Sequence, residues 1–183
     1  MTKQVLFIQG GGETTHDDWD NKLVESLERE LGRDFEIRYP RMPSEADPKY
    51  SLWKAALQKE FARLDDGAIL VGHSIGATIL INVLAEESSG LAPSGIFLIA
   101  APFVGNGGWP SEDFESMANL GARLPKQWKI YFYQGSEDET VPFGHVDMHE
   151  RAIPQAVVRR LAGRDHQLNE DLSEVAADIR RLE

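Results

Sequence analysis

One stretch, residues 68–84, limits most strongly what this chain can fold into. It opens with a short apolar run, 68–71, whose length and branched side chains are typical of a strand buried on both faces. The pentapeptide GHSIG at 72–76 follows, and it matches the pattern G-x-S-x-G. An apolar stretch with helical spacing, 77–85, comes next. Strand, sharp turn and helix form the context in which this pattern presents a nucleophilic serine, here Ser74.

The residue types around Ser74 each have a physical reason. The serine is expected at the tip of the turn with a strained backbone, where a side chain at Gly72 or Gly76 would collide with its neighbours. The following helix would direct its free N–H groups and its positive dipole end at Ser74, so the N–H of Ile75 is one candidate oxyanion donor. The bare pattern occurs by chance in roughly one chain in fifteen of this length. The flanking strand and helix therefore carry the prediction.

The composition narrows the chemistry further. A length of 183 residues predicts a single domain, 1–183, with a sizeable core. The net charge of −11 argues against non-specific nucleic-acid binding, and the lack of cysteine excludes disulfides, thiolate catalysis and cysteine-based zinc sites. The apolar run at 5–8 is too short for a signal peptide or a membrane span. A cytoplasmic location with no membrane partner is expected by default, and the choice between monomer and homodimer stays open.

Predicted strands alternate with predicted helices along the whole chain. This alternation predicts an α/β fold with a mostly parallel central sheet of about six strands and helices on both faces. Strands are expected at 4–9, 35–39, 68–71, 95–101, 128–134 and 155–161, and helices at 19–31, 50–64, 77–85, 112–120, 143–153 and 172–182.

The least regular segment, 102–125, follows the carboxyl end of a strand, which is where open α/β sheets bind ligands. We expect it to form a small cap over the site. Phe103, Trp109 and Met117 are candidates for lining an apolar substrate pocket, and ordinary core packing of these three side chains is an equal alternative.

A glycine-rich loop, Gly10-Gly11-Gly12, directly follows the first predicted strand and is a further candidate for part of the site. Glycines let the backbone approach a ligand closely, yet the loop lacks the spacing of both nucleotide-binding glycine motifs. Gly11 or Gly12 is the candidate for a second oxyanion donor, and a flexible turn is the alternative. His16, just beyond, either borders the site or caps the next helix.

A serine hydroxyl needs a base to take its proton, and the chain has five histidines. His73 adjoins Ser74, but its side chain leaves the turn in another direction. His145 and His149 are four apart on a predicted helix, yet there is no H-E-x-x-H pattern and no third ligand, so no metal site is expected. His166 follows the last predicted strand, which is where the base lies in a chain ordered Ser, Asp, His.

The acid that orients such a base should lie between Ser74 and His166, at the carboxyl end of a strand. Asp138 meets both conditions within a G-x-x-D-x-x-V-P stretch at 135–142. A carboxylate there would hold the imidazole in the correct tautomer and stabilise its protonated form. The rival acids are Glu137, Glu139 and Asp165.

Together these motifs make the chain resemble the small serine hydrolases of the retinoblastoma-binding-protein-9 type, which include bacterial YdeN-like proteins. The two specific motifs are GHSIGA at 72–77 and GxxDxxVP at 135–142, while GGGxxTTH with Trp19 and the late GxxH are looser. The resemblance implies a minimal α/β-hydrolase fold that lacks the first strands of larger hydrolases. It also implies a triad of Ser74, Asp138 and His166. The late motif departs from the family in lacking a second glycine beside the histidine.

The predicted activity is therefore hydrolysis of carboxylic esters or related acyl bonds through an acyl-enzyme, with a small acyl substrate and no cofactor. Thioester, lactone or amide hydrolysis and perhydrolysis on the same triad remain alternatives. A further alternative is a binding protein that keeps the turn around Ser74 but has little activity, because fold alone does not decide function. Dehalogenase chemistry is disfavoured, since it calls for a carboxylate at the position of Ser74.

Overall fold

A single parallel sheet runs through the molecule. The computed structural model describes residues 2–86, 90–117 and 119–182, and every pair of neighbouring strands in it is parallel. The strands are β1 (Lys3–Ile8), β2 (Phe35–Arg38), β3 (Ile69–His73), β4 (Gly95–Ile99), β5 (Ile130–Gly135) and β6 (Val157–Leu161). Their order is β2-β1-β3-β4-β5-β6, so the path of the chain changes direction between β1 and β3. Open parallel sheets bind ligands at the carboxyl ends of strands beside such a point.

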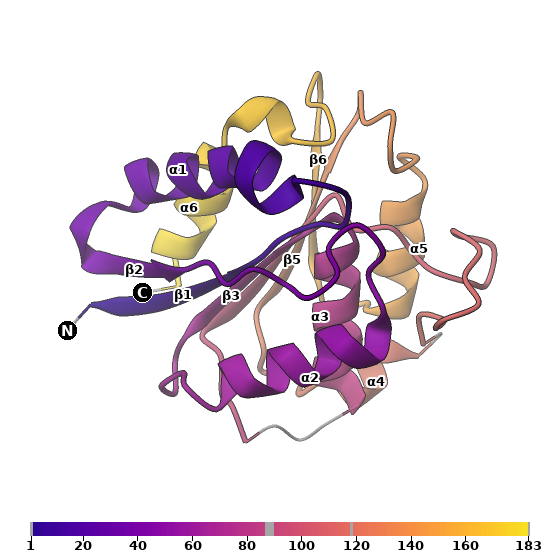
Figure 1. The fold of residues 1–183 in the computed structure, drawn as a ribbon, viewed down its shortest axis with the longest axis horizontal. Helices are drawn as coiled ribbons and strands as arrows, with labels where there is room; N and C mark the ends of the chain where they lie inside the picture. The colour runs from indigo at the N-terminus through magenta and orange to yellow at the C-terminus, as the bar shows by residue number, and fades with distance from the viewer. Residues whose placement is uncertain (1, 87–89, 118, 183) are drawn as a thin grey trace.

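Helices cover both faces of this sheet, as the alternating pattern predicts (Figure 1). Helices α1 and α6 pack on one face, and the other four pack on the opposite face. The helices are α1 (Asp20–Leu31), α2 (Tyr50–Phe61), α3 (Ser74–Glu86), α4 (Leu120–Arg123), α5 (His145–Ala152) and α6 (Ser173–Arg180). The predicted α/β fold, with a parallel sheet of six strands and helices on both faces, is confirmed.

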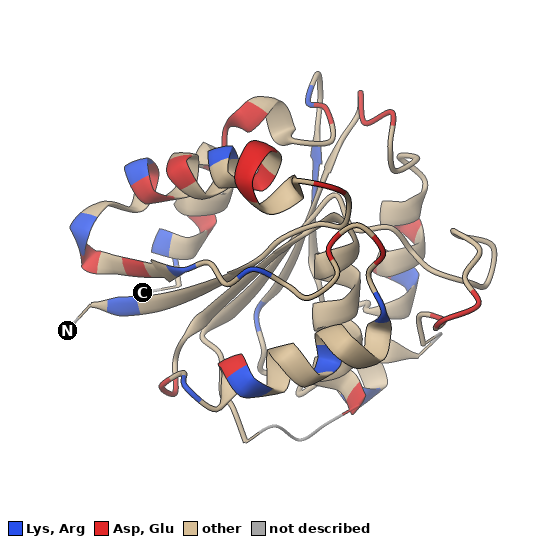
Figure 2. Cartoon of the chain, viewed as in Figure 1, with Lys and Arg blue, Asp and Glu red and all other residues tan. Residues whose placement is uncertain are grey.

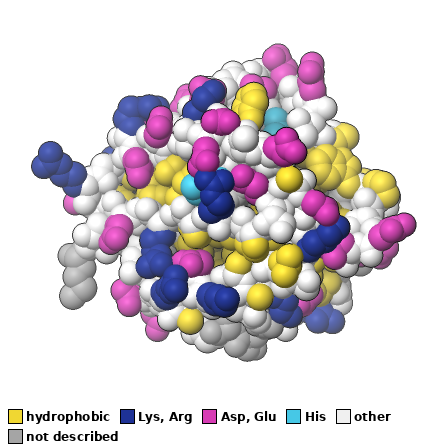
Figure 3. Space-filling model, in the orientation of Figure 1, with side chains coloured by type: hydrophobic (Ala, Val, Ile, Leu, Met, Phe, Trp, Pro, Cys, Tyr) yellow, Lys and Arg dark blue, Asp and Glu magenta, His cyan; other side chains and the backbone are white. Residues whose placement is uncertain are grey.

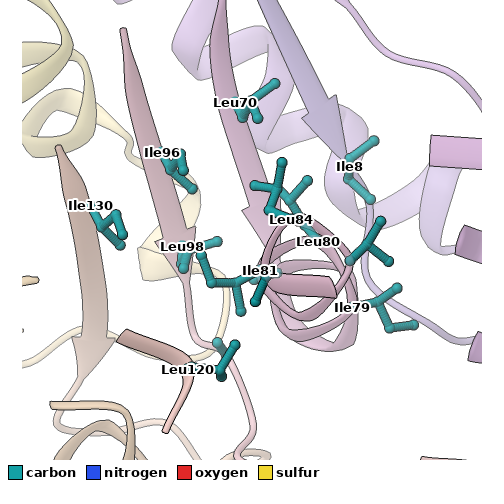
Figure 4. Close-up of a cluster of buried hydrophobic side chains, with 14 of the residues drawn as sticks. Ile8, Leu70, Ile79, Leu80, Ile81, Leu84, Ile96, Leu98, Leu120 and Ile130 are labelled. Carbon is teal, nitrogen blue, oxygen red and sulfur yellow. The ribbon is translucent and has the colours of Figure 1, made fainter. Parts of the chain in front are cut away.

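Apolar residues in the central strands divide between two cores because successive side chains point to opposite faces. In β3, Leu70 packs on the side of α3, while Ile69 and Val71 pack on the side of α1 and α6. Figure 4 shows the first of these cores, in which Leu70 and Ile96 of the sheet belong to the same cluster as Ile81 and Leu84 of α3. Burying one such side chain contributes about 1.5–3 kcal/mol, so the continuous apolar runs are explained by burial on both faces.

Helix α3 is buried on nearly all sides. Every residue from 76 to 85 is buried, and the helix contains no Lys or Arg (Figure 2). By contrast, α1 carries both acidic and basic side chains on its outer surface. A helix that is apolar all round fits only inside a core. Ser74, the first residue of α3, is consequently held at the end of a helix that is buried in the core.

The segment 102–125 differs from its prediction. The expected helix at 112–120 is wrong, because 112–117 is not helical and the helix is the short α4. The N–H of Ser116 donates to the Val104 carbonyl at 2.8 Å, and its Oγ accepts from the Val104 N–H at 3.1 Å. These bonds tie the stretch to 104 and replace the hydrogen bonds that a helix would have made.

The outer surface carries mixed charges. On the face drawn in Figure 3, hydrophobic side chains show between acidic and basic ones. Among the described helices, none combines the length and the apolar character needed to cross a bilayer.

Candidate active site

The turn after β3 holds Ser74 in an uncommon backbone conformation. Its φ is 51°, in the left-handed region that non-glycine residues seldom occupy and that costs on the order of 1–2 kcal/mol. A Cβ on Gly72 would lie 2.7 Å from Cα of Ala77, and one on Gly76 would lie 2.0 Å from the Gln9 carbonyl oxygen. Only glycine fits at either position, because the strand and the helix leave no room for a side chain.

Three side chains from separate loops form one hydrogen-bonded chain. Ser74 Oγ lies 3.1 Å from Nε2 of His166, and Nδ1 of His166 lies 2.9 Å from Oδ2 of Asp138. With its proton on Nδ1, the imidazole donates to the carboxylate and accepts from the serine hydroxyl. The structure thus brings together Ser74, His166 and Asp138, which are separated by up to 92 positions in sequence.

Asp138 is fixed by more than the imidazole. Its side chain is fully buried, Oδ1 accepts the N–H groups of Thr140 and Val141, and Oδ2 also accepts from Nε2 of Gln134. Burial opposes ionisation, yet the hydrogen bond from His166 and those from the backbone hold the pKa of this carboxyl below its ordinary value. Asp138 is therefore a carboxylate at neutral pH and can orient His166.

His166 is placed to act as a base. Its side chain is 18% exposed, and burial lowers the pKa of its imidazole below the ordinary histidine value, against the opposing effect of Asp138. The ring is consequently neutral near pH 7, with Nε2 free to accept a proton from Ser74.

The rival acids lie elsewhere. Glu137 and Glu139 are exposed to solvent on either side of Asp138. Asp165 is exposed too, and its Oδ1 accepts the N–H groups of Gln167 and Asn169 within its own loop. The carboxylate in contact with His166 is that of Asp138.

The glycine loop after β1 lies beside the turn. Gly10 donates its N–H to Asp20 Oδ2 at 2.7 Å, and Gly12 donates to the Glu45 carbonyl at 2.6 Å. Within the described part of the chain, no hydrogen bond uses the N–H of Gly11. A Cβ on Gly11 would lie 3.0 Å from Cγ2 of Ile75, so the two residues are neighbours.

The first N–H groups of a helix have no partner within it, and Ile75 is the second residue of α3. Gly11 and Ile75 thus offer two adjacent N–H donors for an oxyanion beside Ser74. Gly12 is excluded as the second donor because Glu45 already occupies its N–H.

A cavity of about 610 Å³ opens over Ser74 and His166. Its walls are mainly apolar, and the segment 102–125 forms one of them. Two acids, Asp47 and Asp113, also line it, while none of the described Lys or Arg residues does. The larger apolar wall residues include Trp19, Pro48, Ile75, Val104, Trp109 and Phe114.

Of the four side chains predicted to line the pocket, Trp109 does so and the other three do not. His16 stacks on Tyr39 with ring centroids 4.1 Å apart and contacts Asp17 through Nδ1. Phe103 is buried in the core beside α3, and Met117 packs against that same core. For these two, burial in the core is the alternative that the structure supports.

Residues 5–182 match the model of the alpha/beta hydrolase family. The chain belongs to this family. No curated protein matches significantly.

Several solved structures superpose over nearly the whole chain. The ydeN gene product of B. subtilis is 19% identical, with a TM-score of 0.74, over 99% of this chain and 98% of that one. An esterase domain from Rhodothermus marinus is 19% identical, with a TM-score of 0.68, over 98% and 86%. A serine hydrolase without a lid from Xanthomonas campestris is 19% identical, with a TM-score of 0.65, over 100% and 82%. The expected likeness to YdeN-like hydrolases is confirmed.

For three residues, Trp19, Asp20 and His73, the sequence analysis predicted no place at the site of this α/β hydrolase. Trp19 has the spacing of a core residue, but it lies in the π-helical turn Thr15–Trp19 before α1 and is 53% exposed. Asp20 and His73 form a buried pair beneath His166, with Nδ1 and Oδ2 2.9 Å apart. The sequence contains no local signal for this contact, because the two residues are 53 positions apart.

The remaining two histidines serve the packing of α5. His145 accepts the N–H of Phe103 at Nδ1, and Nε2 of His149 lies 3.2 Å from the Ala101 carbonyl. Burial lowers the pKa of His149 to about 4. Among the described residues no group of three or more His, Asp or Glu side chains could hold a metal ion.

Proposed function

We propose that this α/β hydrolase is a serine esterase that cleaves uncharged carboxylic esters through an acyl-enzyme. The observation that carries the proposal is the series of hydrogen bonds Ser74–His166–Asp138, with contacts of 3.1 and 2.9 Å, in which Ser74 and His166 line the cavity. The family supports hydrolase chemistry, and the Rhodothermus esterase domain and the Xanthomonas serine hydrolase are similar in fold.

In the first half-reaction Ser74 Oγ forms a bond to the acyl carbon while Nε2 of His166 takes the hydroxyl proton. The N–H groups of Ile75 and Gly11 stabilise the resulting oxyanion, and Asp138 stabilises the imidazolium. The imidazolium then gives its proton to the leaving alkoxide as the C–O bond breaks, and the alcohol departs.

In the second half-reaction His166 takes a proton from a water molecule whose oxygen attacks the acyl carbon. The tetrahedral intermediate again places its negative charge against Ile75 and Gly11. The proton returns from His166 to Ser74 Oγ as the bond to the acyl group breaks. The products are the carboxylic acid and the regenerated enzyme.

The lining of the cavity supports the choice of substrate. Apolar walls favour aliphatic or aromatic groups next to the ester. The carboxylate of Asp113 repels anions, while that of Asp47 is partly balanced by Lys49 Nζ at 3.0 Å, and no described Lys or Arg lines the cavity itself. Substrates that carry phosphate or carboxylate groups, such as nucleotide-bearing thioesters, are therefore disfavoured.

Hydrolysis of a short p-nitrophenyl ester tests the chemistry. Ser74→Ala is expected to reduce kcat by at least about a thousandfold and to abolish labelling by a fluorophosphonate probe. Ser111→Ala is the matched control, because Ser111 lines the same cavity without belonging to the hydrogen-bonded chain, and it should still label. Equal rates in Ser74→Ala and the unmodified protein would reject the proposal.

The substrate class is tested with matched esters of equal length that end in a methyl or a carboxylate group. The neutral ester should have the higher kcat/KM, and Asp113→Asn should narrow the difference. A preference for the carboxylate ester would contradict the assignment to uncharged substrates while leaving the serine chemistry intact.

A further inference from the structure

A second carboxylate–imidazole pair lies directly beneath the site. Asp20, the first residue of α1, and His73, the last residue of β3, are 0% and 1% exposed. The rings of His73 and His166 are neighbours, with centroids 4.8 Å apart. Buried charges are costly unless paired and hydrogen-bonded, so a buried pair at this position calls for an explanation.

Both nitrogens of His73 face acceptors. Nδ1 lies 2.9 Å from Asp20 Oδ2, and Nε2 lies 3.0 Å from the backbone carbonyl of His166. A carbonyl oxygen only accepts hydrogen bonds, as does an ionised carboxylate, so the ring satisfies both contacts when both nitrogens carry protons. Burial alone would lower the pKa of His73, but the charge and hydrogen bond of Asp20 raise it above its ordinary value.

Asp20 connects the same pair to two further segments. Its Oδ2 also accepts the N–H of Gly10, next to the candidate oxyanion donor Gly11. Its Oδ1 accepts from Nε2 of Gln167 at 3.3 Å, next to His166. One carboxylate thereby ties the glycine loop, the end of β3 and the His166 loop together.

The loop that carries His166 needs such support. Three consecutive residues after it, Leu168, Asn169 and Glu170, have φ values of 48°, 57° and 58°. Left-handed backbone is unfavourable for non-glycine residues and persists only where surrounding contacts impose it. The hydrogen bond from His73 fixes the carbonyl of His166 itself, at the beginning of this strained stretch.

We propose that Asp20 and His73 are positioning residues that act as a charged strut, which sets the distance between the His166 imidazole, Ser74 and the oxyanion loop. Neither residue touches Ser74 Oγ or takes a reacting proton. The inference rests on the proposed esterase function, because the distance that the strut maintains matters only if His166 is the base.

Two substitutions separate the contacts of His73. His73→Asn puts an amide N–H near the place of Nδ1, so it keeps the contact with Asp20 and is too short to reach His166. His73→Gln puts an amide N–H near the place of Nε2, so it keeps the contact with His166 and loses Asp20. His73→Asn is expected to lower kcat about a hundredfold with little change in KM, and His73→Gln to lower it less.

The pH dependence of kcat/KM provides a measurement that a mere loss of packing around His73 would not change. The titratable groups around His166 are Asp138, His73 and Asp20. Removing the cation in His73→Gln leaves the Asp20 charge unbalanced, which raises the pKa of His166 and moves the acid limb of kcat/KM up by about one pH unit. Asp20→Asn removes both charges, since His73 then becomes neutral, so it should lower kcat with little shift of the limb.

His16→Gln is the matched control, because the His16 side chain is 18% exposed, like that of His166, and its ring nitrogens contact Asp17 and the Tyr39 carbonyl. The unmodified protein offers a second measurement that does not depend on the folding of any variant. Nitrogen NMR at neutral pH should show both ring nitrogens of His73 protonated.

A neutral His73 ring in that spectrum would overturn the strut. A kcat and an acid limb of kcat/KM equal to those of the unmodified protein in both His73 variants would also overturn it. Equal losses of kcat in the two variants, without a shift of the acid limb, would do the same. Each of these results leaves the esterase proposal standing as long as Ser74→Ala is inactive. If Ser74→Ala is fully active, the esterase proposal fails, and the strut fails with it.

Discussion

Two histidines lie side by side in this α/β hydrolase, each 2.9 Å from a carboxylate, yet their surroundings differ. His166 is 18% exposed, and one of its nitrogens faces the hydroxyl of Ser74 at the floor of the cavity. His73 is 1% exposed, and both of its nitrogens face acceptors that hold no exchangeable proton.

The comparison shows that an Asp–His contact does not define a role by itself. Burial lowers the pKa of His166, so its ring is neutral and can accept a proton. Both nitrogens of His73 face acceptors, and the charge of Asp20 outweighs burial and raises the pKa of that ring, so a protonated ring satisfies both contacts and has no lone pair to offer. The Asp138–His166 pair can therefore accept a proton, while the Asp20–His73 pair can only position neighbouring groups.

Removing the base should have the largest effect. His166→Ala is expected to lower kcat by about 10⁶, because serine nucleophiles depend almost wholly on their base. Steady-state hydrolysis of a p-nitrophenyl ester measures this. His16→Ala is the control, and a loss in His166→Ala no larger than in that control would break the comparison.

Removing only the charge that orients the base should cost less. Asp138→Asn preserves the shape of the side chain but favours the wrong tautomer of His166, and a drop in kcat of about 10⁴ is expected. Glu139→Gln, one residue away and exposed, should leave kcat unchanged. Equal activities in these two variants would show that Asp138 does not orient the imidazole.

The buried pair should matter more for stability. Asp20→Ala leaves the His73 imidazole unpaired in the interior, and breaking a buried pair in this way costs about 3–5 kcal/mol of unfolding free energy. Denaturant unfolding measures the loss. Asp17→Ala removes the exposed partner of His16 and should leave the unfolding midpoint in place. A midpoint in Asp20→Ala equal to that of the unmodified protein would contradict the ion pair.

The smallest effect concerns pH. Protonation of His166 removes the base. The value of kcat/KM is therefore highest above the pKa of His166 and falls as the pH drops through that pKa. Burial lowers that pKa, so the acid limb should lie below pH ~6.5, the ordinary histidine value. A pH series of kcat/KM, with folding checked by circular dichroism at each pH, locates the limb. A midpoint clearly above the ordinary value would show that Asp138 outweighs burial.

The sequence alone determined the fold class and the principal loops. Doubly buried strands read as continuous apolar runs, and GHSIG between such a run and an apolar helix predicts a sharp turn that requires glycine at 72 and 76. These are local properties, since each depends on residues within a few positions of one another. The placement of Ser74, Asp138 and His166 in successive loops followed from the parallel topology, because the carboxyl ends of parallel strands share one edge.

Only the tertiary structure decided which side chains face the site. Phe103 and Trp109 are both aromatic and six positions apart, yet one is in the core and the other lines the cavity. Gly11 and Gly12 are adjacent, and only a carbonyl at Glu45 distinguishes their N–H groups. Asp20 meets His73 across 53 positions. Such choices depend on contacts between distant segments, and no periodicity or motif in the sequence encodes them.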